Sequence, residues 1–163
     1  MVDINVLMQK TIGGLIKWYT HPIENKSQVV LMMMELKTLL MDCHAHMHVT
    51  SKVGIFTIGD LRQFLEEDIE GLNEFLTITD HYMVSDLKDP LKGFIAYLVD
   101  CSRSFVSAGA VDKEDPRLND IMVYTAGVGD YIDYLLANEV LWKRWVGRRI
   151  GGTKLQRPGH PTE

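Results

Sequence analysis

Apolar residues recur every three or four positions in five stretches of this 163-residue chain, and nowhere do apolar and polar residues alternate with period 2. Such a repeat lines one face of a helix with apolar side chains, which must be buried against another element. A chain of this length builds one core without disulfide or metal staples. The sequence therefore predicts an all-α fold: about five helices in a bundle-like single domain over residues 1–150, followed by an extended arm over residues 151–163.

The first two helices have recognisable limits. Asp3 stands at an N-cap position, and His21-Pro22 predicts the end of the first helix, because the residue before proline avoids helical dihedral angles. The next helix is expected from about Glu24 to His48, with a break over residues 51–54. It is apolar nearly all round and contains neither glycine nor proline, which predicts a buried central helix.

The later helices are marked by their first residues. Thr57, followed three residues later by Asp60, resembles a capping box. Two Asp-Pro pairs, at 89–90 and 115–116, each predict an aspartate N-cap followed by proline in the first helical position. Residues 80–87 are then expected to form a short helical turn or linker between the third and fourth helices.

Glycines interrupt two of the predicted helices. Gly127 and Gly129 lie inside the last one, where each costs about 1 kcal/mol relative to alanine. They predict either a kink or a close approach of a second helix. The Gly13-Gly14 pair of the first helix is expected to serve packing rather than function.

The charge of the chain is divided unevenly. Residues 140–163 contain six basic and one acidic residue, a balance of +5, whereas the remaining 139 residues carry a balance of −10. The arm over residues 151–163 has a Gly-Gly pair, two prolines and no apolar repeat. An acidic body with a basic end predicts an interaction arm, whose partner is an acidic protein surface or a nucleic acid.

Tryptophan and basic residues gather near this end. The candidate partner-binding residues are Trp142, Lys143, Arg144, Trp145, Arg148, Arg149, Lys154 and Arg157. Tryptophan and arginine are common anchors of protein interfaces. They also suit nucleic acids, because arginine neutralises phosphate and aromatic rings stack on bases.

A cluster of histidines near residue 45 suggests a metal site. Cys43, His44, His46 and His48 fall within six residues, and neutral imidazole and thiolate are good ligands for zinc. On a helix, His44 and His48 share one face, and His46 points the opposite way. A metal site is therefore one alternative, with His44 and His48 as ligands and a third ligand from elsewhere in the chain.

Carboxylates form a second candidate site. Glu66, Glu67 and Glu70 are followed, after 15 residues, by Asp86 and Asp89. This pattern resembles the EExxE and ExxD signatures of the all-α nucleoside triphosphate pyrophosphohydrolases of the MazG type. The resemblance implies that carboxylates from two helices hold Mg²⁺, which bridges the substrate phosphates and activates water.

That resemblance covers about 24 residues and departs from the signature at two points. Aspartate opens the second motif, and Asp89 is expected to be an N-cap rather than a residue inside a helix. On a helical wheel centred on Leu65, the glutamates at 66, 67 and 70 face away from the predicted core. A magnesium site of these glutamates and Asp86 would therefore need a second chain.

The charge division and the C-terminal cluster together predict a non-enzymatic assembly or adaptor protein that binds no metal or cofactor. We expect a homo-oligomer or a larger complex. Phage head–tail connectors and related structural subunits similarly combine a helical body with extended arms, which is an analogy of architecture. The alternatives are the magnesium-dependent pyrophosphohydrolase and a His/Cys metal-binding regulator.

Location follows from cysteine content and hydropathy. Two cysteines, Cys43 and Cys101, make no disulfide framework, and no leader precedes Asp3. The expected location is the cytoplasm, or a virion if the chain is phage-encoded. The longest uninterrupted apolar run, Val29–Met34, is far shorter than the ~20 residues that cross a bilayer, so no membrane partner is expected.

Overall fold

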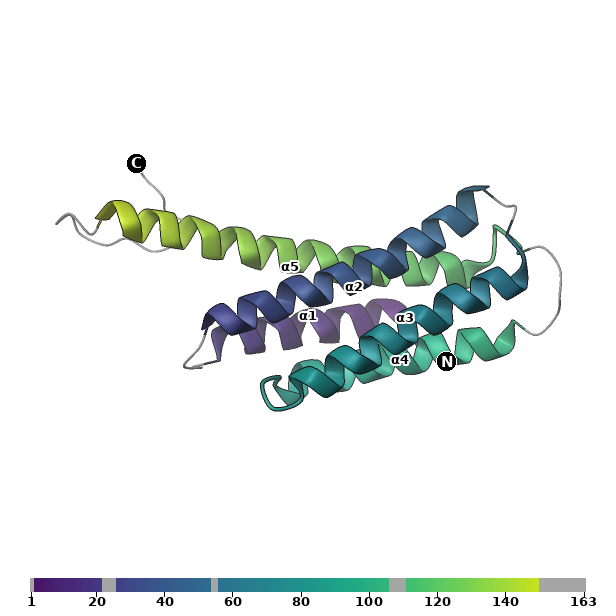
Figure 1. Cartoon of the computed structure of the whole chain (residues 1–163), viewed down its shortest axis with the longest axis horizontal. Helices are drawn as coiled ribbons and strands as arrows, with labels where there is room; N and C mark the ends of the chain where they lie inside the picture. The colour runs from purple at the N-terminus through teal and green to yellow at the C-terminus, as the bar shows by residue number, and fades with distance from the viewer. Residues whose placement is uncertain (1, 22–25, 54–55, 106–110, 150–163) are drawn as a thin grey trace.

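The computed structural model describes residues 2–21, 26–53, 56–105 and 111–149, of which 53 and 138–149 are described for the backbone alone. The described residues form five α-helices, as predicted. They are α1 (Ile4–Thr20), α2 (Lys26–Val53), α3 (Ile58–Thr79), α4 (Ser85–Ser104) and α5 (Pro116–Arg149). The helices lie side by side in an elongated bundle (Figure 1). The extended arm predicted over residues 151–163 lies outside the described residues.

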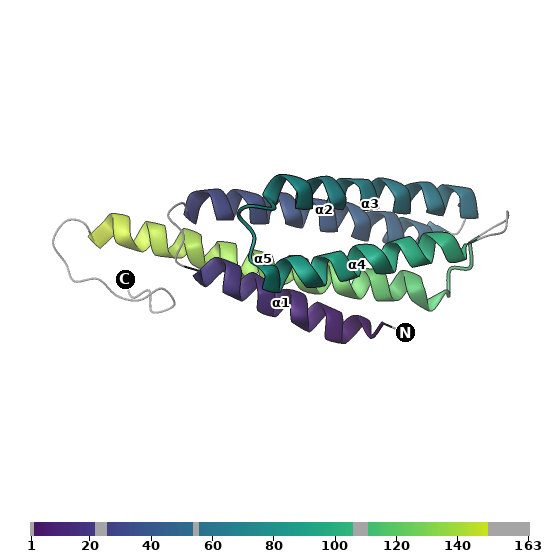
Figure 2. The same ribbon diagram turned by 90° about the horizontal axis from the view of Figure 1, so that it is seen from below.

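The order of the helices around the bundle differs from their order in the chain. α2 packs between α3 and α5, and α4 packs against α3. α1 packs mainly against α4 and α5, with a smaller contact to α2 (Figures 1 and 2). The first helix therefore closes the ring by joining the last two.

Aromatic side chains with satisfied polar atoms occupy the part of the core around α1. The indole N–H of Trp18 donates to the carbonyl of Tyr82 at 2.8 Å. The hydroxyl of Tyr124 lies 2.7 Å from the hydroxyl of Thr11, and its ring stacks on Phe94 with centroids 3.9 Å apart. Buried tryptophan and tyrosine need such partners. These contacts tie α1 to the turn between α3 and α4 and to α5, and they tie α5 to α4.

Two helix starts have the predicted caps. Asp3 accepts hydrogen bonds from the backbone N–H groups of Asn5 and Val6. Thr57 and Asp60 form a complete capping box at the start of α3. The end of α1 at Thr20, with His21 in an extended conformation, is also as predicted.

The predicted break over residues 51–54 is wrong for residues 51–53, because α2 continues to Val53, and Gly54 lies outside the described residues. The hydroxyls of Thr50 and Ser51 donate to the carbonyls of His46 and His48, which keeps these polar residues within the helix. α2 is also not buried all round. Leu31 is 65% exposed and Met34 is about half exposed, so part of its apolar surface faces solvent.

The predicted start of α4 at Asp89-Pro90 is wrong as well. The helix begins at Ser85, with Val84 as an N-cap that makes no side-chain hydrogen bond, and Pro90 is its sixth residue. Lys88 supports this earlier start, since its ammonium group donates to the carbonyl and the carboxylate of Asp80. Proline has no N–H, so the bond that residue 90 would normally donate to the carbonyl of Asp86 is missing.

That same carbonyl lies against Gly14 of α1. A Cβ atom built on Gly14 would stand 2.5 Å from the Cα of Leu87 and 2.7 Å from the carbonyl carbon of Asp86. Both are backbone atoms, which have no room to move aside. α1 and α4 thus touch backbone to backbone, and the glycine predicted to serve packing does so.

The two glycines of α5 also mark close approaches, one of the two alternatives that the sequence predicted. A Cβ atom on Gly127 would collide with the thioether of Met8 on α1, and one on Gly129 would lie 2.5 Å from the methyl group of Met41 on α2. The two positions face different helices. α5 is therefore wedged between α1 and α2 at its middle.

Over the described part of the chain, no helix has the length and apolar character needed to cross a membrane.

The two adjacent glycines of α1 provide a matched test of the α1–α4 contact. We expect Gly14→Ala to reduce the free energy of unfolding by about 1–3 kcal/mol, because the added methyl group meets fixed backbone atoms. Gly13→Ala has nothing within 4 Å of the new methyl group, and should raise stability by about 0.5–1 kcal/mol through helix propensity. Urea unfolding of both variants measures this; equal effects would contradict the contact.

Candidate functional site

The candidate partner-binding residues lie at the end of α5. The residues from Trp142 to Arg149 belong to its last turns, whereas Lys154 and Arg157 lie outside the described residues. Among residues with described side chains, Leu135 is the last that α5 buries. The ribbon then continues past the start of α2 and the end of α1 (Figures 1 and 2). The Trp/Arg sequence is therefore carried on a helix end that leaves the bundle.

An apolar groove runs between the first half of α2 and the second half of α3. It has a volume of about 410 Å³. Each helix contributes residues at spacings of three and four. The groove is lined by Gln28, Leu31, Met32, Glu35 and Leu39 of α2 and by Gly71, Glu74, Phe75, Ile78 and Thr79 of α3.

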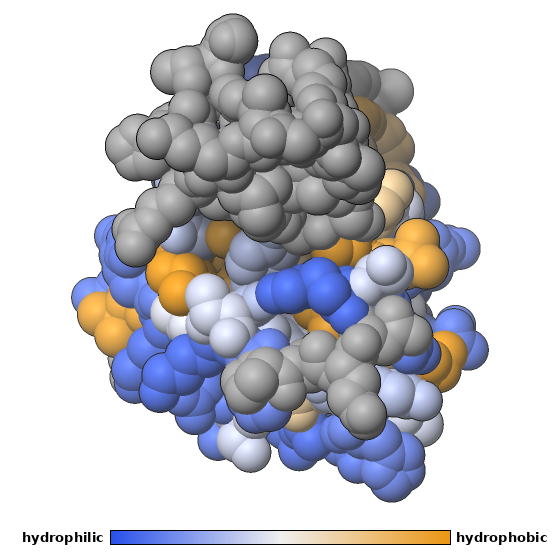
Figure 3. Space-filling model, turned by 90° about the vertical axis from the view of Figure 1, so that its left-hand side faces the viewer, coloured by the Kyte–Doolittle hydropathy of each residue, from blue (hydrophilic) through white to orange (hydrophobic). Residues whose placement is uncertain are grey.

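Large apolar side chains stand open in this groove. Leu31 is 65% exposed and Ile78 is 66% exposed. Gly71 lets the side chain of Leu39 approach, since a Cβ atom there would lie only 3.1 Å from a Leu39 methyl group. Figure 3 looks onto the end of the molecule where α2 begins and α3 ends, and orange apolar side chains lie exposed there among blue hydrophilic ones. Such a surface is typical of a contact site for another protein segment.

The groove is acidic as well as apolar. Glu35 and Glu74 are its two titratable lining residues, and both are carboxylates. Glu70, one turn before Glu74, is exposed on the same helix. Lys37 of α2, which does not line the groove, is paired with Asp133 of α5 at 2.6 Å. A segment that binds here therefore meets apolar side chains and negative charge.

Sequence reasoning missed this groove because it assigned the apolar run of α2 to the core. The signal was present in the phase of that run. The buried residues of this run repeat at spacings of three and four: Val29, Met33, Leu36 and Leu40. Leu31 is out of step with this repeat and therefore lies on another face of the helix.

The described residues do not bring the pyrophosphohydrolase-like carboxylates together. Glu66, Glu67 and Glu70 are exposed on α3, as the helical wheel predicts. The early start of α4 places Asp86 and Asp89 inside a helix, as the resemblance requires. However, α3 and α4 are joined by a short turn and run antiparallel (Figure 2). At about 1.5 Å of rise per residue, Glu70 and Asp86 are therefore separated by about 12 Å along the shared direction of the two helices.

Asp86 is instead paired with a cation of the same chain. Its carboxylate forms an ion pair with Lys17 of α1. In the part of the chain that the structure describes, no three His, Cys, Asp or Glu residues lie close enough to hold a metal ion. A magnesium site of Glu66, Glu67, Glu70 and Asp86 is thus not assembled within one chain.

His44 and His48 share a face of α2, as predicted, with ring centroids 6.1 Å apart. Burial, and then the neighbouring His48, lowers the pKa of His44 below its ordinary value. The Nδ1 atom of His44 is buried without a hydrogen-bond partner. The third ligand that a zinc site needs is not supplied within the described ranges, since no group of three is found there.

His46 belongs to a buried polar cluster that sequence reasoning did not find. Its Nδ1 atom lies 3.0 Å from both carboxylate oxygens of Asp68 on α3. Its ring stacks on Phe64 with centroids 4.4 Å apart. Asp68 is only 7% exposed. The signal was again the phase: Asp68 lies three residues after Leu65 and four before Leu72, on the buried stripe of α3.

The charges of this cluster are controlled by burial. Burial raises the pKa of the Asp68 carboxyl above its ordinary value, and hydrogen bonds from His46 and Cys43 oppose that rise. Burial, and then the nearby Asp68, raises the pKa of the Cys43 thiol well above its ordinary value. Cys43 is therefore a neutral hydrogen-bond donor rather than a thiolate nucleophile or metal ligand. The cluster fastens α2 to α3.

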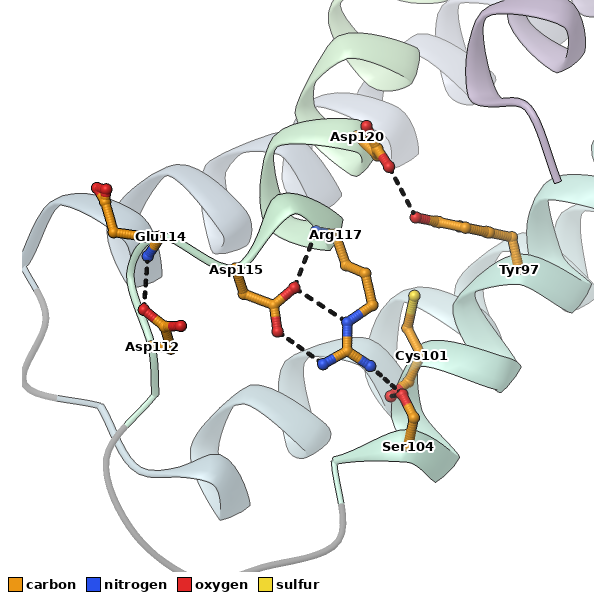
Figure 4. Close-up of polar contacts among 8 residues, drawn as sticks. All are labelled: Tyr97, Cys101, Ser104, Asp112, Glu114, Asp115, Arg117 and Asp120. Carbon is orange, nitrogen blue, oxygen red and sulfur yellow. Dashed lines mark hydrogen bonds and ion pairs between the residues drawn. The ribbon is translucent and has the colours of Figure 1, made fainter. Parts of the chain in front are cut away.

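A second polar cluster fixes the start of α5 against the end of α4 (Figure 4). Asp115 accepts from the backbone N–H of Arg117 at 2.9 Å, as expected of an N-cap, and also from the Arg117 guanidinium. Arg117 in turn donates to Ser104 and lies over the ring of Phe105. These groups serve each other as partners, which is typical of a structural lock.

Cys101 lies within the same region. Burial raises the pKa of its thiol to about 11, so the thiol is neutral at physiological pH. The neighbouring Tyr97 hydroxyl donates to Asp120 at 3.4 Å, and burial raises the pKa of this phenol above its ordinary value. Neither group is activated as a nucleophile or base.

The Asp68 cluster predicts a contrast between two neighbouring acidic residues. Asp68→Ala leaves Cys43 and His46 without their acceptor and should reduce the free energy of unfolding by about 2 kcal/mol. Glu66→Ala, two residues away and exposed, should change it by less than about 0.5 kcal/mol. Urea unfolding at neutral pH measures both values; similar effects would show that the cluster contributes nothing.

The same cluster predicts a pH dependence. The folded state holds the Asp68 proton more tightly than the unfolded state, so this group contributes most stability at low pH. That contribution is lost as the pH rises from about 4 through the raised folded pKa. We therefore expect the stability difference between wild type and Asp68→Asn to fall over this range and then level off. Unfolding curves of both proteins between pH 4 and pH 7 test this; a pH-independent difference would contradict it.

Comparisons with known proteins identify no relative of this chain. The sequence matches no protein-family model, and no significant match is found among curated proteins or among solved structures. The geometry of α5 and of the groove between α2 and α3 is therefore the basis for inferring function.

Proposed function

We propose that this protein is a non-enzymatic, self-assembling helical subunit that uses the basic end of α5 to bind a further copy of itself. The observation that carries the proposal is the course of α5, whose last turns continue past the helices beside it (Figures 1 and 2). An isolated helix end of this length is marginal in water. Contact with another molecule would stabilise it.

The sequence of this helix end supports binding to protein. The apolar repeat of α5 continues beyond Leu135, its last described buried residue, to Trp142 and Trp145. Four basic residues accompany the tryptophans: Lys143, Arg144, Arg148 and Arg149. The rest of the chain is acidic, so a second copy offers a surface of opposite charge.

The chemistry of the described residues supports a structural role. Cys43 and Cys101 are buried and neutral, and Asp68 and Asp115 are bound by neighbours of the same fold. The free cysteines favour a reducing compartment. We infer a cytoplasmic location, or a virion if the chain is phage-encoded, where a subunit of this kind would join a homo-oligomer or a larger assembly.

Light scattering of the full-length chain tests this proposal. At about 50 mM salt we expect a discrete oligomer, and at about 500 mM salt a shift toward the monomer, because the contact is electrostatic. Arg144→Glu/Arg148→Glu should produce the monomer even at low salt. A monomer for the wild type at low salt and high protein concentration would overturn self-assembly.

A matched control separates this effect from net charge. Lys10→Glu/Lys113→Glu makes the same change in charge at two exposed positions of the bundle and should leave the oligomer intact. Both double variants should keep the wild-type Tm within about 2 °C, since surface changes cost little. A loss of many degrees for the α5 variant would place this helix end in the chain's own core and contradict the proposal.

A further inference from the structure

We propose that the groove between α2 and α3 is the receptor for the α5 end of a second copy, so that two chains exchange these helix ends reciprocally. This inference rests on the proposed function, because it names the surface that the α5 end binds.

The shape of the groove suits a helix. The α2 residues that line it, from Gln28 to Leu39, recur at spacings of three and four, and so do those of α3 from Gly71 to Ile78. Two such stripes side by side form a groove into which a third helix can pack its own apolar stripe. The lining of α2 spans 12 positions, and the α5 end over residues 138–149 has the same length, about 17 Å along a helix.

The floor of the groove is apolar, and its side chains leave it open. Leu31 and Ile78 are each about two-thirds exposed, and they stand on opposite helices. Phe75 and Leu39 lie deeper. A helix carrying Leu141, Trp142 and Trp145 would remove Leu31 and Ile78 from water.

The charges of groove and helix end are opposite. Glu35 on α2 and Glu74 on α3 flank the apolar floor, and none of the described lining residues is a cation. The α5 end over residues 138–149 contains four basic residues and one acidic residue, Glu139, which lies before the basic cluster. Pairing at the rim of an apolar contact chooses the partner and its orientation.

The groove and the projecting end of α5 lie at the same end of the molecule, which favours a second copy as the partner and a closed dimer as the product. α2 begins, α3 ends and α5 projects at the same end of the bundle (Figures 1 and 2). α5 itself packs on another face of α2, where Asp133 pairs with Lys37 and Gly129 meets Met41. Two copies that meet at this end can each supply a helix end and a groove. Such an exchange has two-fold symmetry and stops at the dimer.

Reversal of charge on each side of the contact tests the proposal with the full-length chain. Glu35→Lys/Glu74→Lys in the groove should raise the dimer dissociation constant about tenfold or more, because a basic groove then faces a basic helix end. Arg144→Glu/Arg148→Glu should do the same. Circular dichroism and Tm confirm that each variant is folded.

Mixing these two variants gives the decisive result. In the mixed dimer one contact is wild type and the other has both charges reversed, so attraction returns at both sites. We expect the mixture to form dimers at low salt although each variant alone is a monomer. Glu66→Lys/Glu67→Lys, which makes the same change on exposed residues of α3 outside the groove lining, should leave the wild-type dimer unchanged.

The remaining outcomes distinguish this inference from the proposed function. If the α5 variant dissociates and the groove variant does not, self-assembly stands and the groove is not the receptor. If the groove variant alone dissociates, or if the mixture stays monomeric, the groove does not receive the α5 end. A wild-type chain that is monomeric at every salt concentration overturns both proposals.

Discussion

The backbone contact between α1 and α4 fixes the geometry on which the bundle depends. Gly14 gives α1 the space to approach Asp86 and Leu87, and Pro90 leaves the Asp86 carbonyl without its usual helical donor. At this separation Trp18 reaches the carbonyl of Tyr82, and Thr11 reaches Tyr124 on α5. α1 thereby fixes the spacing of α4 and α5.

Features that depend on a few neighbouring residues were predictable from the sequence. Asp3 and the Thr57–Asp60 box act within one turn of helix, and both were confirmed. The two Asp-Pro pairs look alike locally, yet only the second begins a helix at its proline. The first lies inside α4, where contacts with α1 and the turn after α3 outweigh the local preference. No local pattern contains that information.

The candidate site shows the same division. The exposure of Glu66, Glu67 and Glu70 and the shared face of His44 and His48 follow from helical geometry and were predicted. The burial of Asp68 and the exposure of Leu31 followed from the phase of the apolar stripes, but they became visible only when α2 and α3 were paired. The projection of the α5 end beyond the bundle could not be predicted, because it depends on where the neighbouring helices begin and end, and the pattern of a single helix does not contain that information.

The place of α1 in the ring has a consequence for how the chain folds as it is made. α1 precedes the other four described helices in the chain, but its main partners are α4 and α5, and the hydroxyls of Thr11 and Tyr124 belong to residues 113 positions apart. Long-range contacts of this kind slow folding. On the ribosome, α2 and α3 can pair while the apolar face of α1 remains open until α4 emerges. Completion of the bundle is thereby delayed until α4 and α5 have both been synthesised.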